Sequence, residues 1–345
     1  MNATRPLDPF NESQWLHHIA TVEQVGAFRM GHLLLMTAIF VAGMIGNVLT
    51  CLVIYCDRSM HNVTNYYLFN LAVSDLVVLI IMFIELIYKV RQLSDQQDEW
   101  GDLDCKVQFF MVGALWNNGV LIMTALAVER YVAVRHPLAA KRRRVRRRVA
   151  RVMAAVWTAA VLETLPDVFV IRLVETRVGP VCFVALTWYT RVINAATAVV
   201  TFLLPLTVML YMYIAIAITV NAGQNQNHGD NIFNHRNHRK KVNNLIMALT
   251  LSFLVCWLPH FGLRVLVAFG TPRVLLILPQ YLVLWYEAVG VSAWFSSVLN
   301  PLLFSLMSTK FRKALKNLWY TKLLRRNLGS IYEPSTINCR VGSHS

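Results

Sequence analysis

Seven long apolar runs constrain the fold of this chain more than any other feature of its sequence. A helix needs about 20 mostly apolar residues to cross the hydrocarbon core of a bilayer. Only 15% of the 345 residues are charged, whereas about a quarter are charged in a typical soluble domain. The runs are roughly Leu33–Tyr55, Tyr66–Tyr88, Val107–Val134, Val149–Ile171, Val192–Val220, Val242–Phe269 and Val274–Leu306. The sequence therefore predicts an all-α membrane protein, a seven-transmembrane helix bundle.

The segments outside these runs are short, so no separate soluble domain is expected. The chain divides into an N-terminal tail (1–30), a transmembrane domain (31–308), a short C-terminal helix (309–320) and a C-terminal tail (321–345). In the short helix, Phe311, Leu315 and Leu318 are interspersed with basic residues. This amphipathic pattern is typical of a helix that lies on a membrane surface.

Basic residues are concentrated in alternate connecting segments. Residues 135–151 contain nine Lys or Arg and no acid, and residues 310–326 contain seven bases and no acid. The connection 91–104 instead contains five acids and one Arg. Because cytoplasmic loops carry the excess of Lys and Arg, we expect a multi-pass plasma-membrane protein with its N-terminus outside and its C-terminus in the cytoplasm.

The net charge of +15 does not indicate a nucleic-acid partner. The most basic stretch, residues 141–148, lies between two apolar runs, where it would meet the headgroups of anionic lipids. Membrane lipids are therefore an expected partner, and nucleic acid is not.

Cysteine and asparagine positions suggest covalent modification of the outer side. Cys105 and Cys182 are the two cysteines expected there, and an oxidising exterior favours a disulfide bond between them. Asn2 and Asn11 begin Asn-x-Ser/Thr sequences in the N-terminal tail and are expected to be glycosylated. We see no Cys and His spacing typical of a metal site, so neither a metal nor another cofactor is expected.

An acid and a base stand side by side at the end of the third run. Residues 109–128 carry no charge, and Glu129, Arg130 and Tyr131 follow them directly. A charge deep in a membrane helix costs about 2.5–3.5 kcal/mol on insertion scales and usually marks function. Alternatively, Arg130 simply begins a basic cytoplasmic loop.

Motifs in all seven runs resemble the rhodopsin-like (class A) G-protein-coupled receptors. Besides Glu129-Arg130-Tyr131, they are Gly46-Asn47, 71–75 (LAVSD), Cys105, Trp157, Pro205 with Tyr213, 256–259 (CWLP) and 300–304 (NPLLF). Residues 64–70 and 304–308 are similar to the neuropeptide receptors near neuromedin U, pyrokinin, ghrelin and thyrotropin-releasing hormone. The resemblance implies a non-enzymatic receptor that transmits the binding of an extracellular neuropeptide to a heterotrimeric G protein.

The resemblance also implies two groups of functional residues on the cytoplasmic side of the ligand site, one for G-protein coupling and one for activation. Glu129, Arg130, Tyr131 and Tyr213 would couple to the G protein. Asp75 and Asn300 are polar groups deep in apolar helices, which need each other, water or an ion, and prolines kink their helices. The expected activation core is Asp75, Asn300, Pro301, Pro259 and Phe253.

Charged residues in the outer halves of the runs are the candidates for ligand binding. Glu85 and Arg264 resemble an acid and a base of the neuromedin-like receptors, and such a pair suits a peptide end with an Arg and a polar terminus. Alternatively, they pair with each other or reach to lipid headgroups. Trp257 is expected to sense ligand depth. Further candidates are Arg191 and Glu287, and a structural role is favoured for Glu163, Asp167 and Glu287.

Departures from the family pattern narrow the expected behaviour. Val112 stands where amine receptors carry an Asp, and residues 274–307 contain no Lys for a retinal Schiff base. Phe304 replaces a usual Tyr, and the bases 239–241 stand where some relatives have an acid that locks the Arg of the triplet. We therefore expect raised basal activity. Gly119, in place of a Ser near Asp75, predicts a weak or absent sodium site.

Two other functions are compatible with seven spans. A receptor for a non-peptide small molecule would use the same bundle. A transporter is disfavoured because many transporters are built from internal repeats, and we see no repeat relating the two halves of the chain.

Overall fold

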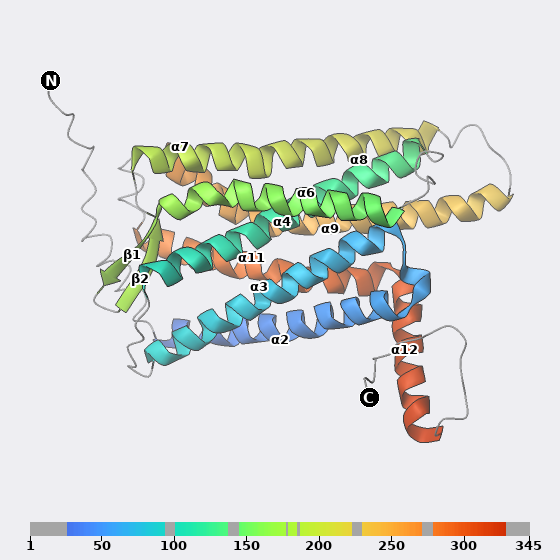
Figure 1. The fold of residues 1–345 in the computed structure, drawn as a ribbon, viewed down its shortest axis with the longest axis horizontal. Helices are drawn as coiled ribbons and strands as arrows, with labels where there is room; N and C mark the ends of the chain where they lie inside the picture. Colours follow the sequence, from blue (N-terminus) through green and yellow to red (C-terminus); the bar gives the residue numbers. More distant parts are fainter. Residues whose placement is uncertain are drawn as a thin grey trace.

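A computed structural model shows the predicted bundle of membrane-spanning helices (Figure 1). Seven helical stretches are long and apolar enough to cross a membrane, which confirms the expected fold class. The glycosylation candidates Asn2 and Asn11 lie outside the described residues, which are 26–93, 101–136, 145–176, 179–184, 187–222, 230–270 and 279–328.

The spans follow one another with short connections. The first three are α2 (Gly26–Cys56), α3 (Val63–Leu93, after the 3-10 turn η1, Arg58–Met60) and α4 (Asp102–Arg135). The fourth is α6 (Val145–Thr164), which continues into the 3-10 segment η2 (Leu165–Phe169). The fifth joins α7 (Trp188–Thr197), η3 (Ala198–Leu203) and α8 (Leu204–Ala222), and the last two are α9 (Asp230–Phe269) and α11 (Pro279–Met307).

α4 is the central helix of the bundle. In its most apolar window 61% of the residues are buried, against at most 44% in any other span. Ile122, Met123, Leu126 and Ala127 on this helix are completely buried. The middle of α4 is therefore surrounded by other helices, and Glu129 and Arg130, which follow it, are half-buried.

The fifth span departs from regular α-helical geometry in the turns before Pro205. Pro205 has no backbone N–H, so the carbonyl of Thr201 loses its regular helical partner. The six residues of η3, immediately before α8, adopt π-helical geometry, which is the usual form of a helix bulge. Pro259 and Pro301 lie inside α9 and α11.

A β-hairpin that the sequence analysis did not predict lies at one end of the bundle (Figure 1). Strands β1 (Ile171–Thr176) and β2 (Gly179–Val184) pair antiparallel, with Ile171 opposite Val184. The fourth run was expected to stay helical to Ile171, but Pro166 enters the 3-10 turn and the β-branched residues that follow favour a strand. We call this end of the bundle the hairpin end.

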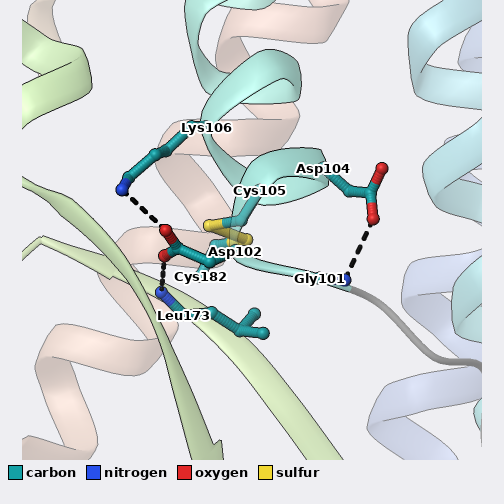
Figure 2. Close-up of a disulfide and its surroundings, with 7 residues drawn as sticks. All are labelled: Gly101, Asp102, Asp104, Cys105, Lys106, Leu173 and Cys182. Carbon is teal, nitrogen blue, oxygen red and sulfur yellow. Dashed lines mark hydrogen bonds and ion pairs between the residues drawn. A yellow bond between two sulfur atoms is a disulfide. The ribbon is translucent and has the colours of Figure 1, made fainter.

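The hairpin is attached to α4 at two points (Figure 2). Cys105 and Cys182 form the expected disulfide bond, with their Cα atoms 5.7 Å apart. The Asp102 carboxylate accepts a hydrogen bond from the Leu173 N–H at 3.0 Å and pairs with Lys106 at 2.6 Å. The position of the hairpin is therefore fixed by one covalent and one polar link.

The C-terminal helix α12 runs from Thr309 to Leu328 and not to residue 320 as expected. It runs across the end of the bundle opposite the hairpin (Figure 1), which we call the α12 end. Phe311, Ala314 and Leu318 are buried, whereas Lys313 and Lys316 on the other face are exposed. The amphipathic pattern thus packs the helix against the bundle.

Removing the disulfide bond should lower the stability of the receptor. The bond closes a loop across a sequence separation of 77, and disulfides typically contribute about 2–4 kcal/mol by restricting the unfolded chain. We expect the Cys105→Ser/Cys182→Ser variant to unfold at a lower temperature in detergent, as measured by scanning fluorimetry. Cys51→Ser, which removes a free thiol, is the control. An unchanged unfolding temperature would contradict this role.

Candidate functional site

The carboxylate of Asp75 is buried at the centre of the bundle and joins two helices. Its two oxygens accept hydrogen bonds from the Ser297 hydroxyl at 3.0 Å and from the Asn300 amide at 2.8 Å. Asn47 donates to the Ser297 carbonyl at 2.9 Å, which adds α2 to the network. The structure thus pairs Asp75 with Asn300, which is one of the three alternatives (each other, water or an ion) that the sequence left open.

A cavity of about 20 Å³ lies beside this carboxylate. That volume suffices for a water molecule. Gly119 in its wall offers no hydroxyl, and the hydroxyls of Ser74 and Ser297 already make hydrogen bonds within the protein. Gly119 therefore removes one possible oxygen ligand from the cavity wall, and weak sodium binding stays a prediction.

An aromatic cluster separates this cavity from the hairpin end. Trp257 is 3% exposed and stacks on Phe253 with ring centroids 5.3 Å apart. Trp116 meets Trp257 edge to face at 4.8 Å and Trp294 at 5.7 Å. We call Trp116, Phe253, Trp257 and Trp294 the aromatic cluster. Trp116, Phe253 and Trp257 also line the Asp75 cavity, so a shift of the cluster changes the surroundings of Asp75.

Arg264 lies above this cluster in an ion pair with Asp167. The guanidinium makes two parallel hydrogen bonds to the carboxylate, at 2.6 and 3.2 Å. Its remaining contacts are the Asn194 side-chain oxygen at 3.3 Å and the imidazole of His260 at 3.2 Å. The side chains of Arg264 and Asp167 are only 17% and 13% exposed. Bidentate Arg–carboxylate pairs in such surroundings are strong and directional.

The Arg264–Asp167 ion pair differs from the alternative considered from the sequence, in which Arg264 pairs with Glu85. The acid bound to Arg264 is Asp167, for which the sequence offered no reason to expect a specific partner. It comes from η2, 97 positions away along the chain. The spacing of Ala160, Thr164 and Asp167 places the three on one face of the helix, and Ala160 and Thr164 are buried. This spacing is the sequence signal that could have predicted an inward-facing Asp167.

The other ligand candidates come from several spans around the same end. Glu85 lies on α3 and Arg191 on α7, and both are half-buried. The side chain of Glu287, on α11, lies outside the described residues. Glu163 on α6 has one carboxylate oxygen that is buried without a hydrogen bond among the described atoms.

At the α12 end, Glu129 pairs across helices and not with the adjacent Arg130. Its carboxylate accepts a hydrogen bond from Arg148 of α6 at 2.7 Å, and the Tyr67 hydroxyl lies 3.5 Å from the other oxygen. Within the described part of the chain, Arg130 makes no hydrogen bond or ion pair. Sequence reasoning missed Arg148 because it is one of nine basic residues in the stretch 135–151.

Two further contacts at this end involve positions singled out in the sequence. The hydroxyls of Tyr213 and Thr250 lie 2.6 Å apart and join α8 to α9. Phe304 is buried and packs near Phe311 of α12, with ring centroids 6.2 Å apart. The ring that replaces the usual Tyr therefore fills the core between α11 and α12. The side chains of residues 239–241 lie outside the described residues.

The bundle has a charged site at one end and, at the other, Arg130 without an ion-pair partner among the described residues. This is the architecture of a heptahelical receptor. Residues 46–304 match the family of 7 transmembrane receptors (rhodopsin family), and the chain belongs to this family. It is a G-protein-coupled receptor and not an enzyme, and the family assignment gives the transporter alternative no support.

Relatives in this family are receptors for neuropeptides. The chain is 32% identical to human neuromedin-U receptor 2 over 332 residues, which cover 90% of this chain and 77% of the relative. It is 31% identical to neuromedin-U receptor 1 of Rattus norvegicus, covering 81% and 70% of the two chains. It is 25% identical to the pyrokinin-1 receptor of Drosophila melanogaster, covering 88% and 82%. The resemblance seen in the sequence motifs is thereby confirmed.

Breaking the Arg264–Asp167 pair from one side should destabilise the receptor. Asp167→Asn leaves a largely buried guanidinium without its counter-ion. We expect a loss of about 3 kcal/mol, the lower end of the range for buried pairs. Thermal unfolding in detergent measures this loss.

Lys106→Gln provides the matched control, because it breaks an ion pair whose side chains are 33% and 51% exposed. Such surface pairs contribute about 0–1 kcal/mol. Equal effects of the two substitutions would show that the Arg264–Asp167 pair does not stabilise the hairpin end.

Proposed function

We propose that this receptor binds an extracellular neuropeptide at the hairpin end and activates a heterotrimeric G protein at the α12 end. In this orientation the hairpin end lies outside the cell and α12 lies at the cytoplasmic surface. The exposed bases Arg135, Arg147 and Arg151 at the α12 end, and the acids Asp102 and Asp104 at the hairpin end, support it.

One observation carries the proposal, namely the Arg264–Asp167 network directly above the aromatic cluster. It offers a fixed cation, a fixed anion and an amide within one partly buried site. Arg191 on α7 and Glu85 on α3 add a charge of each sign on two other spans. Charges of both signs suit a peptide, which carries charged side chains and polar ends, and the named relatives are receptors for neuromedin U and pyrokinin.

Ligand contact at Arg264 would reach the centre of the bundle through His260. The His260 ring lies 5.6 Å from Trp257 and 5.4 Å from Trp116, and both tryptophans line the Asp75 cavity. To shift a two-state equilibrium from 1:99 to 99:1, a ligand needs about 5.5 kcal/mol of differential affinity. Several charged hydrogen bonds can supply that difference.

A screen of the expressed receptor against amidated neuropeptides, with calcium and cAMP readouts, tests the ligand class. Arg264→Ala and Glu85→Gln should each lower the potency of the best agonist by about 30-fold or more, because each leaves a charged ligand group without its partner. Lys106→Gln, at the same end but in an exposed pair, should leave potency unchanged. Unchanged potency in both site variants would place the peptide elsewhere.

Arg130 is proposed as the residue that engages the G protein. Arg130→Ala should abolish agonist-stimulated nucleotide exchange. Surface expression should be preserved, because Arg130 makes no hydrogen bond or ion pair that joins the described helices. Arg135→Ala removes an exposed base whose contact with Thr219 is long, at 3.4 Å, and should retain coupling. Normal signalling by Arg130→Ala would exclude the proposed role.

A further inference from the structure

Glu129 and Arg130 are adjacent in sequence, yet the structure separates their interactions. Residues one position apart on a helix do not face each other. Glu129 points to α6 and α3, where Arg148 and Tyr67 lie. Glu129 and Tyr213 of α8 are both close enough to Arg130 for an electrostatic interaction, but among the described residues the hydrogen bonds and the ion pair of Glu129 go to Arg148 and Tyr67 and not to Arg130.

Arg148 is distinguished from the bases around it. Arg147 and Arg151 are exposed, as expected for residues that face lipid headgroups or water. Arg148 is instead half-buried, and its Nε atom is buried without a hydrogen bond among the described atoms. The Arg148 side chain thus leaves one donor unsatisfied while another donor holds the Glu129 carboxylate at 2.7 Å. A base needed only for topology would not be drawn inward in this way.

We infer that Arg148 is a positioning residue for G-protein coupling: it holds Glu129 and thereby prevents that carboxylate from neutralising Arg130. The inference rests on the proposed coupling role of Arg130. A guanidinium without a bound carboxylate can donate its hydrogen bonds to the carbonyl groups at the C-terminus of a partner helix, where the helix dipole also favours a cation. If Glu129 were released, it could bind Arg130 and compete with that partner.

Signalling by paired variants tests this inference. Ligand-free nucleotide exchange on purified heterotrimeric G protein is measured with the receptor in nanodiscs. Arg148→Ala should lower exchange about tenfold, equivalent to about 1.4 kcal/mol, and Arg148→Lys should retain most of it. Glu129→Gln/Arg148→Ala should recover the level of Glu129→Gln, because no carboxylate is left to capture Arg130. Arg151→Ala is the matched control and should behave like the unaltered receptor.

These outcomes separate positioning from a merely structural role. If Arg148 only supports the packing of α6 and α4, the double variant stays as low as Arg148→Ala, and the inference is wrong. It is also wrong if Arg148→Ala couples as well as the unaltered receptor or better.

Thermal unfolding tests the capture step without ligand or G protein. In the unaltered receptor Arg130→Ala removes no ion pair and should leave the unfolding temperature nearly unchanged. In the Arg148→Ala background the same substitution should lower it by about 2–4 °C, because Arg130 would then be paired with Glu129. Equal effects in both backgrounds would overturn the inference. A receptor that drives no nucleotide exchange would instead refute the proposed function, and the unfolding comparison would still decide the inference.

Discussion

A charge inside a membrane bundle is costly without a partner, and the pairs that most of these charges form organise the molecule, with Arg130 as the exception among the described residues. Asp75 is buried with both carboxylate oxygens hydrogen-bonded to α11, and this contact holds α3 and α11 together at the centre of the bundle. The same need for a partner joins Arg264 to Asp167 and Glu129 to Arg148. Because apolar contacts between helices are hardly better than contacts with lipid, polar pairs and close packing decide which helices associate.

One face of α9 connects the hairpin end with this centre. Phe253, Trp257, His260 and Arg264 are spaced by four, three and four positions, so they form a single stripe along the helix. Successive members touch, from Arg264 through His260 and Trp257 to Phe253. Pro259 lies in the same stretch of α9 but on another face, and it removes one hydrogen bond from the helix. A force on Arg264 therefore acts on a helix that is weakened just above the Asp75 cavity.

The sequence predicted what depends on composition and local pattern, namely the seven spans and the amphipathic C-terminal helix, and it singled out Asp75 and Asn300 as buried polar groups that need a partner. It could not predict pairings that depend on helix rotation. Arg148 is one of nine bases in residues 135–151. Its rotational position on α6, next to the buried Val149, turns its side chain toward Glu129. Asp167 was expected to have a structural role, but its partner Arg264 comes from a distant helix and could not be predicted from local pattern. The sequence analysis considered Phe304 only as a position that lacks the usual Tyr hydroxyl. In the structure Phe304 is a core residue, because α12 packs against it.

The fourth span supplies charged side chains near both arginines for which a function is proposed. Its η2 end supplies Asp167, which neutralises Arg264, and its opposite end supplies Arg148, which takes Glu129 away from Arg130. The most apolar window of this span is only 22% buried, so it can vary in sequence with little effect on the core. It is nevertheless fixed in rotation by the Trp157 indole, which donates to Asn70 of α3 at 3.2 Å. A peripheral helix with a fixed rotation thus supplies one charged partner at each end of the bundle, while the central carboxylate network depends on α3 and α11.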